Sequence, residues 1–286
     1  MPPRALGYLL ACNAIGGASY LAMAWTLKGF STPAAVFWRL LLGGLLFLPA
    51  ASAQWRATRI ERGDWIRIVV VGVFGLALPL TLGAVGMRLS SATNAALLVG
   101  LEPVSILVLS ALFLGEALSG PKAAAIGLGL LGSAMIAMQG LPWRAGLTPH
   151  WQGDVILMIH AACWSIYSIL AKSALKRVPP TLFTALTTMV AVLPAAVFAV
   201  PTMWPGRVPP LALAALAFQA VAVTYGATLL WNKALELIPA STIANFVFLQ
   251  PVTGALIAAV AGEGALTGWS CAGGALIVAG VTLASR

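Results

Sequence analysis

Ten long apolar stretches follow one another along this chain, and they constrain its fold more than any other feature of the sequence. An α-helix needs about 20 consecutive apolar residues to cross the hydrocarbon core of a bilayer. The stretches cover residues 5–27, 34–52, 64–86, 92–114, 120–139, 153–172, 180–200, 211–232, 240–261 and 267–285. The runs are continuous rather than alternating, which excludes a transmembrane β-barrel. Only 8% of the residues are charged, against about 25% in soluble domains. The sequence therefore predicts an all-α polytopic membrane protein with ten transmembrane helices.

The fourth and ninth stretches share one pattern, a helix interrupted by a proline. Three residues of the first copy match residues 148 positions later: Ala92 with Ala240, Pro103 with Pro251, and Ser119 with Thr267. We therefore predict two related halves, a five-helix repeat over residues 1–140 and a second over 153–286, joined by a linker at 141–152. Because five is odd, the second repeat enters the membrane from the opposite side. Transporters built from such inverted repeats bind substrate near the midplane, between the repeats.

The basic residues predict the orientation of the helices. Cytoplasmic loops of membrane proteins carry an excess of Lys and Arg. With a cytoplasmic N-terminus, eleven cations lie inside, namely Arg4, Arg56, Arg59, Arg62, Arg67, Lys122, Lys172, Lys176, Arg177, Lys233 and Arg286. Lys28, Arg88, Arg144 and Arg207 then lie outside. We expect an integral protein of the cell membrane with both termini in the cytoplasm.

The two broken helices supply the first candidate functional residues. Pro103 and Pro251 lack an amide hydrogen, so we expect each to kink its helix and to free the carbonyl group four residues before it. Glu102 is an acid deep within a span, which makes it a substrate- or proton-binding candidate, although it could instead bond a neighbouring helix. The second copy has Gln250 at this position, and Asn94 and Asn245 add amide groups to the two helices.

Polar and aromatic residues share helix faces elsewhere in the chain. His160, Trp164 and Tyr167 are spaced i, i+4 and i+7 on the sixth span, and therefore share one face. Tyr20 on the first span and Tyr225 on the eighth lie in similar polar stripes. Such faces hold helices together or, where several converge, line a cavity with aromatic walls and a few hydrogen-bonding groups.

Other residues admit a structural interpretation. Glu116 and Glu263 precede Ser119 and Thr267, which are predicted N-caps of the fifth and tenth helices, and an acid is stabilised beside a helix N-terminus. Arg39, within the second span, either extends to the outer surface or faces the cavity. Small residues allow close helix contact, within one subunit or between subunits, and we expect this role for Gly127, Gly129, Gly132, Gly273 and Gly274.

Several classes of function lack the residues that they need. The net charge of +9 follows from the loop cations, so it does not indicate a nucleic-acid partner. The three cysteines have no C-x-x-C spacing, and we expect no disulfide framework, metal site or cofactor. No H-E-x-x-H motif is present, neither Asp64 nor Asp154 lies deep in a span, and no potassium-type filter is seen, which argues against an enzyme and a channel.

These residues resemble the drug/metabolite transporter superfamily, specifically its ten-helix EamA-type members. The resemblance rests on Ala92-Thr93-Asn94, Glu102-Pro103 and Gly115-Glu116, on the second set Ala240, Gln250-Pro251 and Gly262-Glu263, and on Phe37-Trp38-Arg39. It covers the whole chain. It implies a central cavity between two five-helix repeats and the export of a metabolite. Within the superfamily the sequence is similar to the amino-acid exporters called YddG, which handle aromatic and other neutral amino acids.

The leading hypothesis is a carrier that exports a small neutral or zwitterionic metabolite, most plausibly an amino acid, by alternating access. Aromatic walls would hold the side chain, while amide groups, tyrosines and helix-break carbonyls would bind its polar ends. The alternative is a proton-coupled exporter of drugs or cationic compounds, with Glu102 exchanging between cation and proton. A sugar-phosphate carrier is disfavoured, because Arg39 is the one clear cation within the spans and phosphates need several.

Overall fold

The structure is a computed structural model that describes residues 1–90, 98, 100–117, 119–138, 151–204 and 206–285. All regular elements in these residues are helices. Eight of the described helices are long and apolar enough to cross a membrane, and two shorter apolar helices, Leu101–Leu114 and Gly268–Ala284, accompany them. The prediction of an all-α polytopic membrane protein is confirmed.

The first half of the chain forms five spans. Its helices are α1 (Pro3–Thr26), α2 (Thr32–Trp55), α3 (Arg62–Val70), the π-helix η1 (Val71–Ala77), α4 (Leu78–Leu89), α6 (Leu101–Leu114) and α7 (Gly120–Met138). The elements α3, η1 and α4 together form the third span, which is longer than the predicted 64–86.

The second half repeats this order. Its helices are α9 (Trp151–Ala174), α10 (Pro180–Ala199), the 3-10 turn η2 (Val200–Thr202), α11 (Pro210–Phe218), the π-helix η3 (Gln219–Ala227), α12 (Thr228–Leu237), α13 (Ala240–Ala244), the 3-10 segment η4 (Asn245–Phe248), α14 (Leu249–Val260) and α15 (Gly268–Ser285). The elements α11, η3 and α12 form the eighth span. Gln219, where η3 begins, lies 148 positions after Val71, where η1 begins, so the π-helices are a repeated feature that the hydropathy pattern does not reveal.

Local sequence explains where several helices begin and end. The amide of Ala34 donates to Ser31 Oγ (3.3 Å) at the start of α2, and the amide of Ser270 donates to Thr267 Oγ1 (3.2 Å), which confirms Thr267 as the predicted cap of α15. Helices α6 and α14 both end before a glycine with positive φ, 68° at Gly115 and 73° at Gly262. Because glycine has no Cβ, it adopts this left-handed conformation at little cost.

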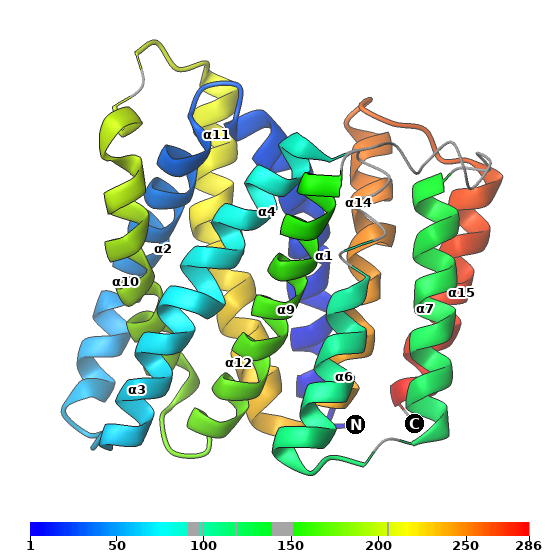
Figure 1. Cartoon of the computed structure of the whole chain (residues 1–286), viewed down its shortest axis with the longest axis horizontal. Coiled ribbons are helices and arrows are strands. Elements are labelled where there is room, and N and C mark those ends of the chain that lie inside the picture. Colours follow the sequence, from blue (N-terminus) through cyan, green and yellow to red (C-terminus); the bar gives the residue numbers. More distant parts are fainter. Residues whose placement is uncertain (91–97, 99, 118, 139–150, 205, 286) are drawn as a thin grey trace.

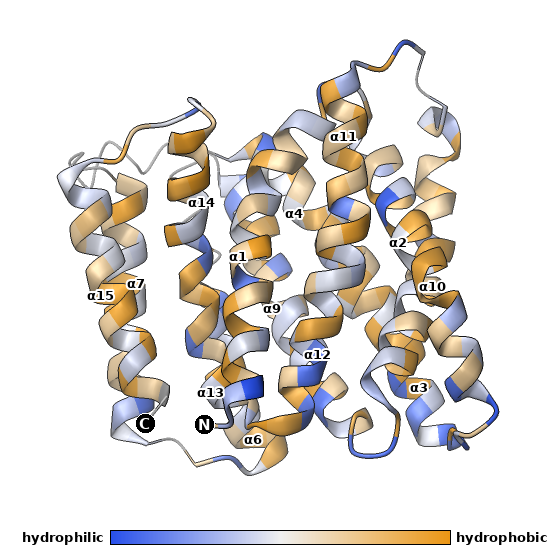
Figure 2. Ribbon diagram, turned by 180° about the vertical axis from the view of Figure 1, so that it is seen from behind, coloured by the Kyte–Doolittle hydropathy of each residue, from blue (hydrophilic) through white to orange (hydrophobic). Residues whose placement is uncertain are grey.

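Both chain termini lie on one face, at the bottom of Figure 1, where α1 begins and α15 ends. We call this the terminal face, and we call the other end of the bundle the opposite face. Figure 2 shows hydrophobic residues along the lengths of the helices, with much of the hydrophilic colour at the helix ends and in the connecting segments. This distribution matches an apolar environment around the helices and water at both faces.

The helices of the two halves interleave, which the repeat pattern alone did not predict. Helix α1 packs against α11, η3, α12 and α14, and we call this group the α1 bundle, together with α13, which connects α12 to η4 and packs mainly on α6. Helix α9 packs against η1, α4 and α6, and this group, with α3, is the α9 bundle. Each bundle therefore takes helices from both repeats. Helices α2 and α10 pack on each other, and α7 packs on α15.

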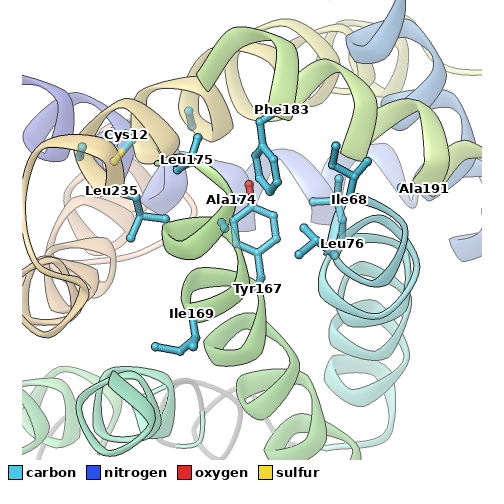
Figure 3. Close-up of a cluster of buried hydrophobic side chains, with 14 of the residues drawn as sticks. Cys12, Ile68, Leu76, Tyr167, Ile169, Ala174, Leu175, Phe183, Ala191 and Leu235 are labelled. Carbon is cyan, nitrogen blue, oxygen red and sulfur yellow. The ribbon is translucent and has the colours of Figure 1, made fainter. Parts of the chain in front are cut away.

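Part of the largest buried cluster among the described residues lies where α9 and α10 meet the third span. Figure 3 shows the rings of Tyr167 and Phe183 next to each other, with Ile68 and Leu76 beside them. Tyr167, Phe183 and Ile68 are completely buried. This cluster fixes α9 relative to the third span, and thereby fixes one wall of the cavity described below.

Candidate functional site

A cavity of about 180 Å³ lies between the α1 bundle and the α9 bundle. Its walls come from seven of the spans, and both bundles contribute. The lining residues are Cys12, Asn13, Gly16, Ser19, Tyr20, Met23, Arg39, Leu76, Leu80, Gly83, Ala84, Glu102, His160, Trp164, Tyr167, Gln219, Val223, Thr224, Ala227, Thr228, Trp231 and Gln250. On α1 they begin at Cys12, so the cavity occupies the middle of the molecule and the half nearer the opposite face.

Glu102 lines this cavity from the start of α6. It is the second residue of the helix, and Pro103 is the third. Within the described residues no hydrogen bond or ion pair engages its carboxyl group, while its main-chain carbonyl accepts a hydrogen bond from Ser165 Oγ (3.2 Å). An acid that faces a cavity in the interior of a membrane protein is available for a ligand or a proton.

Gln250, the counterpart of Glu102 in the second repeat, is held by α1. Its Nε2 donates to Asn13 Oδ1 (3.1 Å), and its Oε1 accepts from the hydroxyl of Tyr20 (3.3 Å). Pro251 follows it as the third residue of α14, and the 3-10 segment η4 comes directly before this helix. Both prolines thus lie in the first turn of a helix, where a missing amide hydrogen costs little. Their role as hinges stays a prediction.

Arg39 faces the cavity. Of the two positions that the sequence allowed, the outer surface and the cavity, the structure shows the second. It is 6% exposed, and its Nε donates to Thr224 Oγ1 (3.1 Å) on η3. Among the described residues Arg39 forms no ion pair, with Glu102 or with any other acid. One cation and one acid therefore line the same cavity without neutralising each other.

The aromatic residues of α9 form one wall. The ring centroids of His160 and Trp164 are 6.4 Å apart, and those of Trp164 and Tyr167 are 5.4 Å apart, each pair edge to face. His160 Nδ1 donates to the carbonyl oxygen of Pro79 (2.7 Å), so Nε2 is the acceptor of the neutral ring. A Cβ at Gly83 would lie 2.8 Å from His160 Cε1, so glycine is needed there for the imidazole to lie against α4.

Tyr167 closes the cavity on the side of the terminal face. It is completely buried, and its hydroxyl accepts a hydrogen bond from Asn232 Nδ2 (2.7 Å). The same amide nitrogen donates to Thr184 Oγ1 (2.9 Å). This network links α9, α10 and α12 beneath the cavity.

Two of the predicted binding residues lie away from the cavity. Tyr225 packs on Phe47, with ring centroids 4.5 Å apart, and is not part of the lining. Asn245 is buried in η4, where its Nδ2 donates to the carbonyl oxygen of Ser241 (3.1 Å). Asn94 lies outside the described residues. The cavity brings together the other six candidates, Tyr20, Glu102, His160, Trp164, Tyr167 and Gln250, and their binding role stays a prediction.

Many residues of the cavity lining were not predicted from the sequence, although the constant offset between the repeats relates several of them to one another. Seven pairs of lining residues are 148 positions apart: Cys12 and His160, Gly16 and Trp164, Ser19 and Tyr167, Leu76 and Thr224, Leu80 and Thr228, Gly83 and Trp231, and Glu102 and Gln250. Glycine in the first repeat is twice matched by tryptophan in the second. The repeat thus places equivalent residues around the cavity and makes its two sides chemically different.

Comparisons with known proteins agree with this architecture. A family model described as the EamA-like transporter family matches residues 4–138 and again residues 151–286. The chain is 24% identical over 284 residues to the uncharacterized transporter YyaM of Bacillus subtilis, covering 97% of this chain and 92% of that protein. It is also 24% identical over 250 residues to an uncharacterized transporter of Archaeoglobus fulgidus, covering 86% and 85%. A solved crystal structure, 22% identical, has the same fold with a TM-score of 0.83, covering 100% of this chain and 97% of that one.

Proposed function

Because the chain belongs to the EamA-like transporter family, a family of membrane transporters, we propose that it exports small neutral or zwitterionic metabolites, above all amino acids, by alternating access. In such a cycle the cavity opens to one side of the membrane at a time, while the substrate is bound near the midplane. The chemistry required is recognition of the substrate and not reaction.

The observation that carries the proposal is that one basic and one acidic side chain, Arg39 and Glu102, line the same cavity. The guanidinium of Arg39 suits a carboxylate, and the carboxyl group of Glu102 suits an ammonium group. The two residues come from different helices and do not pair with each other among the described contacts. An α-amino acid carries both of the matching charges.

The remaining lining suits the side chain of an amino acid. Trp164 and Trp231 offer aromatic surfaces, and Leu76 and Leu80 offer aliphatic ones. Pockets of this kind bind apolar groups through buried surface and orient them with a few polar contacts. This composition supports neutral and aromatic amino acids as substrates, as in the YddG exporters.

The decisive experiment is uptake into proteoliposomes that contain the purified protein. We expect saturable uptake of labelled neutral and aromatic amino acids, and competition by the unlabelled compounds. A panel in which no neutral amino acid is transported above the level of protein-free liposomes would contradict the proposal.

Two variants assign the two charges of the substrate. Arg39→Gln should weaken binding of amino acids while leaving that of the corresponding amines, which lack the carboxylate, nearly unchanged. Glu102→Gln should weaken both. Each loss of a charge-assisted hydrogen bond corresponds to a rise in the half-saturation concentration of roughly tenfold to hundredfold. Equal effects of Arg39→Gln on amines and amino acids would contradict the assignment.

The second candidate function is a proton-coupled exporter of cationic compounds. It is favoured by the carboxyl group of Glu102, which no hydrogen bond or ion pair engages within the described residues. A carrier of this class would transport cationic dyes in response to a pH gradient, and Glu102→Gln would abolish all transport. Retained flux of amino acids in Glu102→Gln would exclude proton exchange at this residue.

A further inference from the structure

The contacts between the two bundles gather on one side of the cavity. We infer that Glu116 and Lys172 form a latch that holds the terminal face closed, and that they are positioning residues of the transport cycle. This inference depends on the proposed alternating access, because a latch between the bundles has a function only if the bundles move apart. We call Glu116, Lys172 and the main-chain groups that they bind the latch.

Glu116 of the α9 bundle binds the first turn of α13 in the α1 bundle. Its Oε1 accepts from the amide of Ala240 (2.9 Å), and its Oε2 accepts from the amide of Ser241 (2.8 Å). The sequence predicted a structural role for Glu116 beside the N-terminus of the fifth span, whereas its carboxylate binds the N-terminus of α13, at the start of the ninth span. Both carboxylate oxygens are thus committed to the ninth span.

Lys172 makes the reverse connection from the end of α9. Its Nζ donates to the main-chain oxygens of Leu235 (2.5 Å) and Ile238 (2.9 Å), which end α12. Lys122 adds a hydrogen bond from Nζ to Ser241 Oγ (2.7 Å). A cation at a helix C-terminus and an acid at a helix N-terminus both match the exposed main-chain groups there. The latch therefore binds the junction between α12 and α13 from two directions.

The opposite half of the molecule has a different pattern in the described residues. There, Tyr20 bonds Gln250, Gln219 bonds the carbonyl of Ser19, and the indole of Trp25 bonds Glu263 (3.3 Å), all within the α1 bundle. Ser90 bonds Asp154 (2.5 Å) within the α9 bundle. The described hydrogen bonds between the two bundles lie at the latch and at Tyr167–Asn232, on the terminal side. The cavity is closed there, and opening it to the terminal face requires the latch to break.

The test measures a distance across the terminal face by electron spin resonance in lipid nanodiscs. Spin labels at Arg62→Cys in the α9 bundle and Leu237→Cys in the α1 bundle report on opening, in a background with Cys12, Cys163 and Cys271 replaced by Ser. Both labelled positions are exposed and lie outside the latch. We expect Glu116→Ala to raise the ratio of long to short distances at least tenfold. Glu116→Gln, which keeps only one of the two oxygens that accept from Ala240 and Ser241, should give an intermediate ratio.

The matched control is Glu263→Ala, which removes the equivalent acid of the second repeat. Glu263 bonds Trp25 within the α1 bundle, so its loss should leave the distances across the terminal face unchanged. The inference is overturned if Glu116→Ala has the distance distribution of the background protein, or if Glu263→Ala shifts it equally.

A second variant and a measurement without substrate keep the test of the latch independent of misfolding and of the identity of the substrate. If Glu116→Ala does not give a monodisperse protein, Lys172→Gln carries the same test, with the same expected shift. The distances are measured without substrate, so they do not depend on which compound is transported. An unchanged distribution in a protein that transports amino acids overturns the latch alone, whereas a shifted distribution in a protein that does not transport them overturns only the substrate class.

Discussion

At the scale of single residues, the floor of the cavity depends on buried polar groups that hydrogen-bond one another through the amide nitrogen of Asn232, while its Oδ1 has no partner among the described residues. Asn232 donates to Tyr167 and to Thr184, and all three residues are completely buried. A membrane offers no water to replace a lost partner in its core. The measured contribution of a hydrogen bond between membrane helices to stability is nevertheless modest, because alternative partners in the bundle compensate in part for its loss.

We expect Tyr167→Phe to lower the stability of the protein by about 1 kcal/mol, because Asn232 keeps only one acceptor. The change is measured as the shift in the midpoint of thermal unfolding in detergent.

The matched control is Tyr225→Phe. The ring of Tyr225 packs on Phe47, and among the described residues its hydroxyl makes no hydrogen bond, so the midpoint should stay within error of the unchanged protein. A destabilisation by Tyr225→Phe as large as that by Tyr167→Phe would contradict the interpretation of the buried network.

At the scale of elements, α7 and α15 pack closely because glycines face each other. A Cβ added to Gly132 would lie 2.5 Å from the carbonyl oxygen of Gly273, and a Cβ added to Gly273 would lie 2.5 Å from that of Gly132. The predicted close contact is confirmed for this pair. Gly127 makes no such contact within the chain, because an added Cβ there meets nothing within 4 Å, and a contact between subunits stays a prediction.

Gly132→Val should separate α7 from α15 and destabilise the protein by about 1–3 kcal/mol, as overpacking does in tight interfaces. Gly127→Ala, on the same helix, should be neutral or slightly stabilising, because alanine favours a helix more than glycine does. Unfolding midpoints of the two variants, measured side by side, check both statements. A tolerated Gly132→Val would show that the two helices do not rely on this contact.

The π-helices η1 and η3 are a second feature at this scale. Both lie in a span that lines the cavity, and each begins at the same position of its repeat. A π-helix turns its residues by less than 100°, so the side chains after it rotate around the helix axis. Leu76 and Thr224, within the two π-helices, and Leu80 and Thr228, which follow them, all line the cavity. Such segments recur at functional sites.

At the scale of the whole molecule, the distribution of basic residues predicts that the terminal face is cytoplasmic. The latch then closes the cytoplasmic side of the cavity. A reporter that works only in the cytoplasm should be active when it is fused to the C-terminus. A reporter that works only outside the cell should be active when it is inserted beside Arg207, in the loop on the opposite face. Activity of a cytoplasmic reporter inserted beside Arg207 would contradict this orientation and the proposed direction of export.

Much of the membrane architecture follows from local sequence. Apolar runs of spanning length predict helices because a bilayer core leaves the main chain no other partners, and a constant offset of 148 residues predicts two halves of equal build. Residues that line the cavity could be predicted where their chemistry is conspicuous, as for Glu102 deep in a span and for the aromatic face of α9. The same reasoning also selected Tyr225 and Asn245, which lie away from the cavity because the ring of Tyr225 packs on Phe47 and the amide of Asn245 bonds Ser241.

The number of membrane spans and the relation between the two halves could be read from the order of residues, because hydropathy and repetition are properties of that order. The folded chain was needed to show that the halves interleave into an α1 bundle and an α9 bundle. Helix pairing depends on the fit of side chains in space, which hydropathy does not encode. For the same reason only the structure could show that Glu116 binds Ala240, 124 positions further along, and that Arg39 and Glu102 face one cavity.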